Sequence, residues 1–142
     1  MRFVRRVVID TSTLIGAVLL PDSIPRQALQ EAVVRGELCA SEATLQELES
    51  VIRRPKFNRY LPLDARSAFV TLVRREAHLF AVTAEEEAVL PRQCRDPRDN
   101  KFLALALACE ADAIVSSDTD LLTLNPYEGI SVLRPREFLD TM

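Results

Sequence analysis

The sequence V-V-I-D-T-S-T at residues 7–13 joins a short run of β-branched apolar residues to an aspartate. A second stretch, A-I-V-S-S-D-T-D at residues 113–120, ends in the same way. Apolar runs of this length, bounded by polar residues, are typical of fully buried strands in parallel sheets. Asp10 and Asp118 would then follow the carboxyl ends of two strands. Ligands bind at this edge in open α/β sheets, so we expect the two carboxylates to face each other across one crevice.

Two further segments bring acidic residues toward this edge. R-D-P-R-D-N at residues 95–100 opens a predicted helix and contributes Asp96 and Asp99. Each also has a purely structural explanation: Asp96 as a turn residue before a proline, and Asp99 as an acid in the first turn of the helix. Glu47 and Glu49 lie on opposite flanks of the apolar stripe of another predicted helix. Helical periodicity therefore does not decide which of these two glutamates turns toward the crevice.

The rest of the chain alternates between strand and helix patterns. Strands are expected at residues 3–9, 37–40, 78–82, 112–116 and 130–133. Helices are expected at 11–20 with Thr11 or Ser12 as cap, at 24–35, between Ser41 and Pro55, and at 63–76, 99–109 and 136–140. Such alternation predicts an α/β fold of three layers, in which a parallel sheet of about five strands in the order 3-2-1-4-5 has helices on both faces.

Length and composition indicate one globular domain spanning residues 1–142. The chain has a mass of 16.0 kDa, and its hydrophobic and charged contents are 48% and 27%. The three cysteines are widely spaced and odd in number, so neither a zinc site nor a disulfide framework is indicated, and a cytoplasmic location is expected. No segment has the pattern of a signal peptide or a membrane span.

The charge distribution is more informative than the net charge of −3, which alone disfavours nucleic acid as a partner. Of the 18 basic residues 16 are arginine, the side chain best suited to bidentate contact with phosphate. Arg53 and Arg54 lie in one basic cluster, and Arg98 lies in another. They are candidate phosphate contacts, with solvated helix ends as the alternative.

Gathered carboxylates require compensation. Two of them about 4 Å apart repel by about 4 kcal/mol at an effective dielectric constant near 20. A hard divalent cation such as Mg²⁺ or Mn²⁺ relieves the repulsion, and it can activate water and bind a phosphate. A crevice of acids without a nucleophilic Ser, Cys or His thus predicts metal-assisted hydrolysis of phosphodiesters. Ser12 and Ser116 could orient water there, or act only as a cap and a strand-end hydroxyl.

Five segments together resemble the PIN-domain ribonucleases, most closely the VapC-like toxins of bacterial toxin–antitoxin pairs. They are V-V-I-D-T-S-T-L (7–14), S-E-A-T-L-Q-E-L (41–48), D-P-R-D-N-K-F-L-A-L-A (96–106), A-D-A-I-V-S-S-D-T-D-L-L (111–122) and R-P-R-E-F-L (134–139). The resemblance covers nearly the whole chain. It implies a PIN-like fold and a Mg²⁺- or Mn²⁺-dependent endonuclease that cleaves single-stranded RNA, forms a homodimer and is neutralised by a small antitoxin.

The resemblance also assigns the site residues. It implies that Asp10, Glu47, Asp99 and Asp118 are catalytic, with Asp10, Asp99 and Asp118 as metal ligands, and it chooses Glu47 over Glu49. Asp96 becomes an auxiliary acid and Asp120 a possible outer ligand. With RNA as the implied substrate, Arg53, Arg54 and Arg98 become candidate RNA contacts. Ser12 stands where many members of the family have asparagine, and a hydroxyl can serve at that position.

Three other classes of protein share parts of this pattern. A haloacid-dehalogenase-type phosphatase needs a second aspartate where this chain has Ser12. A phosphorelay receiver needs a lysine at a later strand end, whereas Lys56 and Lys101 fall on loop or helical segments. A catalytically silent PIN-like module that binds RNA or protein has no reason to retain so many mutually repelling acids.

Overall fold

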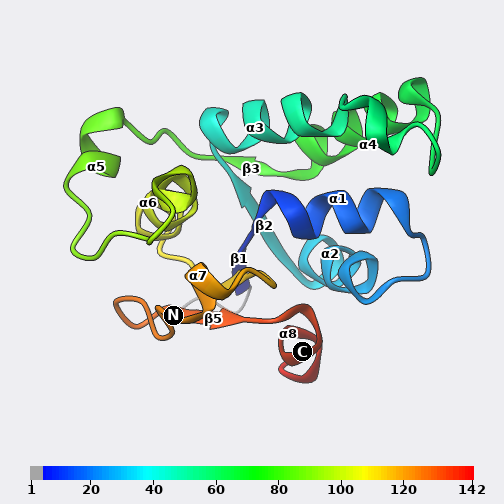
Figure 1. Ribbon diagram of the computed structural model, residues 1–142. Coiled ribbons are helices and arrows are strands. Elements are labelled where there is room, and N and C mark those ends of the chain that lie inside the picture. The colour runs from blue at the N-terminus through cyan, green and yellow to red at the C-terminus, as the bar shows by residue number, and fades with distance from the viewer. Residues whose placement is uncertain (1–4) are drawn as a thin grey trace.

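The computed structural model describes residues 5–142, in which strands and helices alternate along the chain (Figure 1). The strands are β1 Arg5–Ile9, β2 Gly36–Ala40, β3 His78–Leu79, β4 Ala113–Val115 and β5 Ser131–Leu133. The longer helices are α1 Thr11–Leu19, α2 Ile24–Arg35, α3 Glu42–Ile52, α4 Leu63–Glu76 and α6 Asn100–Ala108. The shorter ones are α5 Ala84–Ala88, α7 Thr119–Leu122, α8 Pro135–Asp140 and the 3₁₀ turns η1 Pro55–Phe57 and η2 Pro97–Asp99.

The five strands form one parallel sheet in the order β3-β2-β1-β4-β5, which confirms the predicted order. The central strand β1 aligns Val7 with Leu38 of β2 on one side and with Ala113 of β4 on the other. Since β1 and β4 are parallel neighbours, the residues that follow them emerge at the same edge of the sheet. This topology brings Asp10 close to the segment that contains Asp118.

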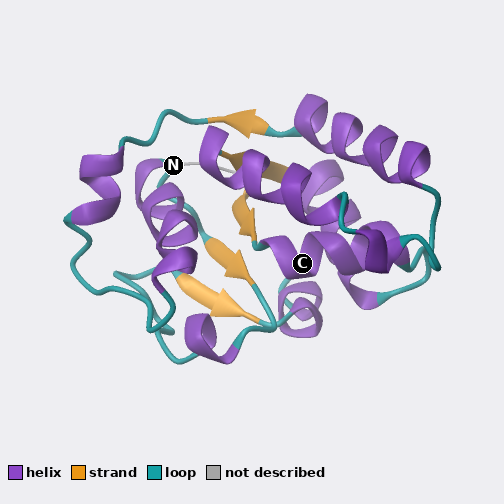
Figure 2. Cartoon of the chain, turned by 45° about the horizontal axis from the view of Figure 1, so that its top comes forward, coloured by secondary structure: helices purple, strands orange, loops and turns teal. Residues whose placement is uncertain are grey.

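Helices cover both faces of this sheet (Figures 1 and 2). Val7 and Ile9 pack on one face with residues of α1, α2, α3, α4 and α8. Val8 points to the other face, where it packs with residues of α6 and α7. The predicted three-layer α/β/α architecture is therefore confirmed, and β1 is buried on both sides as its unbroken apolar run indicates.

The expected elements differ from the observed ones mainly at the margins. Residues 3 and 4 of the first expected strand lie outside the described part of the chain. The helices expected at 24–35 and 63–76 have the bounds of α2 and α4. The strand expected at 78–82 is shortened to His78–Leu79, both exposed, and it pairs with β2 alone at the edge of the sheet.

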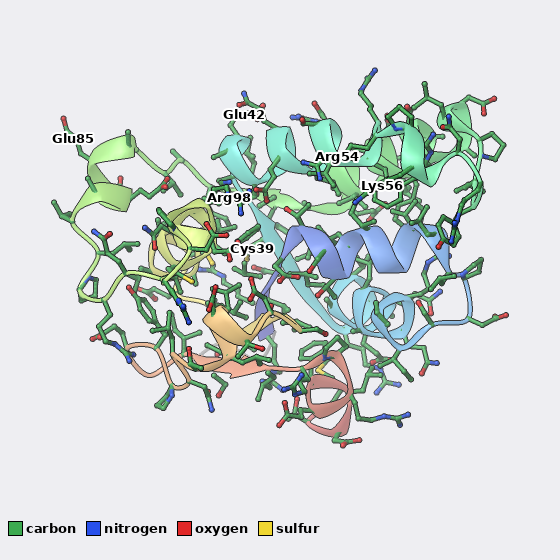
Figure 3. The ribbon with its side chains drawn as sticks, in the orientation of Figure 1. Cys39, Glu42, Arg54, Lys56, Glu85 and Arg98 are labelled. Atoms are coloured by element: carbon green, nitrogen blue, oxygen red, sulfur yellow. The ribbon has the colours of Figure 1, made fainter. Side chains whose placement is uncertain are left out.

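Three other segments complete the frame. Ser41 begins α3 with a capping box, in which its side chain accepts from the Thr44 amide and its own amide donates to the Thr44 hydroxyl. The acid run at residues 85–87 lies in the exposed α5, and Glu85 points outward at the edge of the molecule (Figure 3). Within residues 5–142 no helix is long and apolar enough to cross a bilayer.

The first and last described elements are tied together. The Arg5 guanidinium donates to the Thr141 hydroxyl over 2.7 Å, and it lies 5.9 Å from the centre of the Phe138 ring. Phe138 is fully buried where α8 packs on the sheet and α2. The start of β1 is therefore fixed against the end of α8.

Candidate active site

A polar pocket of about 230 Å³ opens at the carboxyl ends of β1 and β4. Its acidic lining consists of Asp10, Glu47, Asp96, Asp99 and Asp118, and its remaining lining of Thr11, Ser12, Val51, Arg54, Arg98 and Phe102. The structure therefore brings together all four acids expected to be catalytic and one of the two auxiliary acids. Asp10 and Glu47 are 37 residues apart along the chain, and Asp96, the first of the other three acids, comes 49 residues after Glu47.

Asp10 begins α1, and it is held from two sides. Its Oδ1 accepts from the Thr13 amide at 3.0 Å, and its Oδ2 accepts from the Ser116 hydroxyl at 2.5 Å. The prediction of Thr11 or Ser12 as helix cap was wrong, because the aspartate itself serves as the N-cap. Burial raises the pKa of Asp10, and these hydrogen bonds only partly oppose the rise.

Ser116 links the two strand ends. Its buried hydroxyl donates to Asp10 and accepts from the Asp118 amide at 2.9 Å. Ser12 is exposed in the pocket, and its hydroxyl lies 3.5 Å from both Asp10 carboxylate oxygens. Ser116 therefore fixes the geometry of the strand ends, while Ser12 makes only these long contacts with Asp10 and is exposed to solvent.

Asp99 has no such support. Asp118 accepts from the Asp120 amide at 2.9 Å as the cap of α7, whereas the side chain of Asp99 makes no capping bond to α6. One carboxylate oxygen of Asp99, Oδ2, is buried without a hydrogen-bond partner. Burial and the adjacent carboxyl of Asp118 raise the pKa of Asp99 to about 7. The structural alternative, a helix-start acid held by backbone amides, therefore does not apply to Asp99.

Two arginines stand at the rim of the pocket. Arg98 pairs with Asp96 at 2.9 Å and holds the pKa of that carboxyl below its usual range. Figure 3 shows Arg98 beside the start of α6 and Arg54 on the α3 side. Arg53 instead lines a separate hollow between α3 and α4, with Glu49 among its neighbours. Asp120 is not among the residues that line the acidic pocket.

The ambiguity between the two glutamates of α3 has a clear structural outcome. Glu47 lines the pocket, whereas Glu49 forms an ion pair with Arg74 of α4 at 2.7 Å. Glu47 is bound through both oxygens: Lys101 lies 2.8 Å from Oε1, and the Thr11 hydroxyl donates to Oε2. The part played by Lys101 was missed in the sequence. Lys101 is two residues beyond Asp99, a spacing that does not place two helical side chains on one face.

The donor set suits a hard divalent cation. All of the acidic donors are oxygens, and the buried, partnerless Oδ2 of Asp99 beside Asp118 is a position that a cation would satisfy. Within residues 5–142 no group of three His, Cys, Asp or Glu side chains already has the spacing of a complete ligand set. Mutual repulsion of the carboxylates and the pairing of Glu47 with Lys101 both act against such convergence.

Comparison with known proteins gives matches over most of the chain. The family model described as PIN domain matches residues 6–120. An uncharacterized protein of Methanocaldococcus jannaschii, MJ1680, is 30% identical over an alignment that covers 95% of this chain and 90% of that protein.

Solved structures share the fold at low sequence identity. VapBC2 of Rickettsia felis, bound to a DNA fragment from its promoter, has a chain with a TM-score of 0.63 and 10% identity, covering 89% of this chain and 96% of that one. VapC20 of Mycobacterium tuberculosis, a sarcin–ricin loop cleaving toxin, has a TM-score of 0.57 and 15% identity, covering 88% and 98%.

Proposed function

The chain belongs to the PIN-domain family, and we propose that it is a metal-dependent endoribonuclease that cleaves single-stranded RNA. The observation that carries this proposal is the buried Asp99 oxygen without a partner, next to Asp118 and in one pocket with Asp10. PIN domains generally bind divalent metals. We propose Asp10, Asp99 and Asp118 as the residues that hold Mg²⁺ or Mn²⁺, and Glu47 as a further catalytic acid.

The roles follow from the contacts of each side chain. When bound, the ion would activate water and stabilise negative charge on the scissile phosphate. Ser116 and the Thr13 amide fix Asp10 in one orientation, and Ser116 also fixes the backbone of Asp118. Arg54 and Arg98 lie at the rim, where a guanidinium can hold phosphate oxygens in two-point contact. Ser12 is exposed beside Asp10, and its hydroxyl can accept a hydrogen bond from water or donate one to it.

We further propose that the chain is the VapC-like toxin of a toxin–antitoxin pair and forms a homodimer. The likeness to a chain of VapBC2 and to VapC20 supports this assignment. An apolar groove of about 200 Å³ between α2 and α4 lies apart from the acidic pocket, and it shares no lining residue with that pocket. This groove offers a surface for protein partners that leaves the acids accessible.

The test of the enzyme is cleavage of single-stranded RNA by Asp10→Asn and Asp118→Asn variants. Each change removes one negative charge from the pocket, and we expect cleavage to fall by at least about 100-fold. Asparagine caps helices about as well as aspartate, so the circular dichroism spectrum should not change. Glu49→Gln is the matched control: Glu49 shares α3 with Glu47 but faces Arg74, and this variant should retain full activity.

A catalytically silent module is the second candidate, and the pairing of Glu47 with Lys101 and Thr11 favours it. The two candidates differ in their response to metal. A functional site should raise the melting temperature as Mn²⁺ is added, because a ligand that binds only the folded state stabilises it. RNA binding without cleavage, together with an unchanged melting temperature in Mn²⁺, would identify the silent module.

A further inference from the structure

Lys101 is a positive charge placed against one side of the acidic pocket. It projects from α6 to α3, where its Nζ lies 2.8 Å from Oε1 of Glu47. The side chains of Lys101 and Glu47 are 18% and 24% exposed, so water screens this pair only in part. The second oxygen of Glu47 accepts from the Thr11 hydroxyl. Both oxygens of Glu47 are therefore occupied by groups of the protein.

The other three acids have no such cation. No ion pair within residues 5–142 joins Asp10, Asp99 or Asp118 to a lysine or arginine. Their bonds come from neutral hydroxyls and amides, and one oxygen of Asp99 has none. The pocket thus has two sides: Glu47 is already neutralised by the protein, while the three aspartates are not.

We propose that the Lys101 ammonium takes the place of a second metal ion, so that the pocket holds one divalent cation, at Asp10, Asp99 and Asp118, with Glu47 outside its ligand set. This inference rests on the proposed metal-dependent function. Arg98 balances Asp96, and Arg54 is exposed to solvent at the rim. The other four carboxylates carry four negative charges, of which the ammonium and one divalent ion balance three. Without the ammonium, a second divalent ion would balance the remaining charge on Glu47 and its neighbours.

The number of bound ions tests this proposal directly. Mn²⁺ is titrated into the full chain by calorimetry, and electron paramagnetic resonance then reports whether bound Mn²⁺ ions are coupled to one another. We expect the wild-type chain to bind one ion with an uncoupled spectrum. Lys101→Met, which keeps much of the side-chain volume and removes the charge, should bind a second, weaker ion and show a coupled spectrum.

Three variants control this measurement. Lys101→Arg keeps the positive charge, and it should remain at one ion. The double variant Lys101→Met with Glu47→Gln removes both partners, and it should return to one ion. Lys101→Gln retains an amide donor for Glu47 without a charge, so it should bind two ions, and it carries the test if the methionine variant does not fold.

The outcomes separate this inference from the proposed function. One ion in both neutral Lys101 variants, or two in the wild-type chain, would overturn the role of Lys101 while leaving metal-dependent cleavage intact. A wild-type chain that binds no Mn²⁺ would overturn both the inference and the proposed function. Two ions in the neutral variants and one in the wild-type and double-variant chains would support the inference.

Discussion

Each acid of the pocket has a different local environment, and Asp99 has the least favourable one. Asp10 and Asp118 accept amide hydrogens as helix caps, and Asp96 has Arg98 beside it. Asp99 is half-buried next to another carboxyl, and its buried Oδ2 has no hydrogen-bond partner. This residue should therefore control how the metal-free protein responds to pH.

The first prediction concerns that response. The pKa of Asp99 is raised from 3.8 to about 7 in the folded protein, so between these values the folded state binds a proton that the unfolded chain does not. The free energy of unfolding should therefore fall as the pH rises from about 4 to about 7, measured by urea denaturation in chelator. The raised pKa of Asp10 acts in the same direction.

Asp99→Asn is the control for this measurement, because it removes the titrating group without a large change in shape. Its stability should decline less over the same pH range. An equal decline in this variant would assign the effect to other groups. Added Mg²⁺ should stabilise the wild-type chain more at pH 8 than at pH 5.5, since binding must displace the proton at the lower pH.

The second prediction concerns the rim arginines. No ion pair within the described residues engages Arg54, whereas Arg98 must give up its contact with Asp96 to bind phosphate. We expect Arg54→Ala to weaken RNA binding more than Arg98→Ala, and to lower the slope of log affinity against log salt by about 0.7. The measurement uses fluorescence anisotropy in the Asp118→Asn background, which leaves the RNA uncut.

Arg53→Ala is the matched control, since Arg53 is the next residue along the chain but lines a different hollow. Its salt slope should equal that of the parent protein. A lower slope in the Arg53 variant and an unchanged one in the Arg54 variant would mean that RNA follows the groove between α3 and α4 instead of the acidic pocket.

The sequence pattern predicted which acids line the pocket. It did not predict the side-chain contacts that form between segments far apart in the sequence. Asp10 and Asp118 could be placed because an aspartate that follows a buried parallel strand must lie at one known edge of the sheet. Glu47 and Glu49 could not be separated by periodicity, because the choice depends on Arg74 of another helix. The contact of Lys101 with Glu47 joins residues 54 apart in sequence, and no local pattern indicates it.

At the scale of elements, the alternation of strand and helix patterns along the chain was enough to predict the strand order. It did not predict the length of the edge strand or the close packing between α2 and β2. The edge strand β3 is shorter than its apolar sequence indicates, because a strand at the margin is paired and packed on one side only. Where α2 ends and β2 begins, the backbone of Gly36 packs closely against the backbone of β1 and α2, and no sequence pattern indicates this. At Gly36 an added Cβ would lie 2.6 Å from the carbonyl oxygen of Arg5 and 3.1 Å from that of Ala32.

The third prediction tests this junction. Gly36→Ala should destabilise the protein by about 1–3 kcal/mol, because the methyl group would clash with backbone atoms that cannot move aside freely. Gly16→Ala is the control. Gly16 lies inside α1, and a Cβ added there would contact the Pro25 side chain at 3.5 Å, an ordinary van der Waals distance. That change should stabilise the protein by about 0.5–1 kcal/mol. Thermal and urea unfolding measure both, and a stable Gly36 variant would show that β1 and α2 can separate.

At the scale of the whole molecule, polar and apolar surfaces are segregated. The acidic pocket lies at the carboxyl edge of the sheet, and the apolar groove lies between α2 and α4 with Val34 and Leu72 exposed on it. Val34 is 79% exposed and Leu72 is 42% exposed, so protein contact there would remove apolar surface from water. The proposed substrate would bind at the first surface, and the second is where we expect the proposed homodimer contact.

The fourth prediction assigns the homodimer contact to this groove. Leu72→Glu places a charge at the groove, and it should convert dimers into monomers in light scattering coupled to gel filtration, with Mn²⁺ binding unchanged. Leu63→Glu is the control, since Leu63 is on the same helix and 46% exposed but does not line the groove. A dimer that survives the Leu72 change and dissociates with the Leu63 change would place the contact at the other end of α4.

The contact between Arg5 and Thr141 has a consequence for the linear order of the pocket residues. Because the two ends of the described fold touch, a short peptide could join them, and the chain could be reopened at the exposed pair Arg59–Tyr60. In such a circular permutant Asp99 and Asp118 would be synthesised before Asp10 and Glu47. The same pocket should still assemble, since its geometry depends on which strands are neighbours and not on which of them comes first from the ribosome.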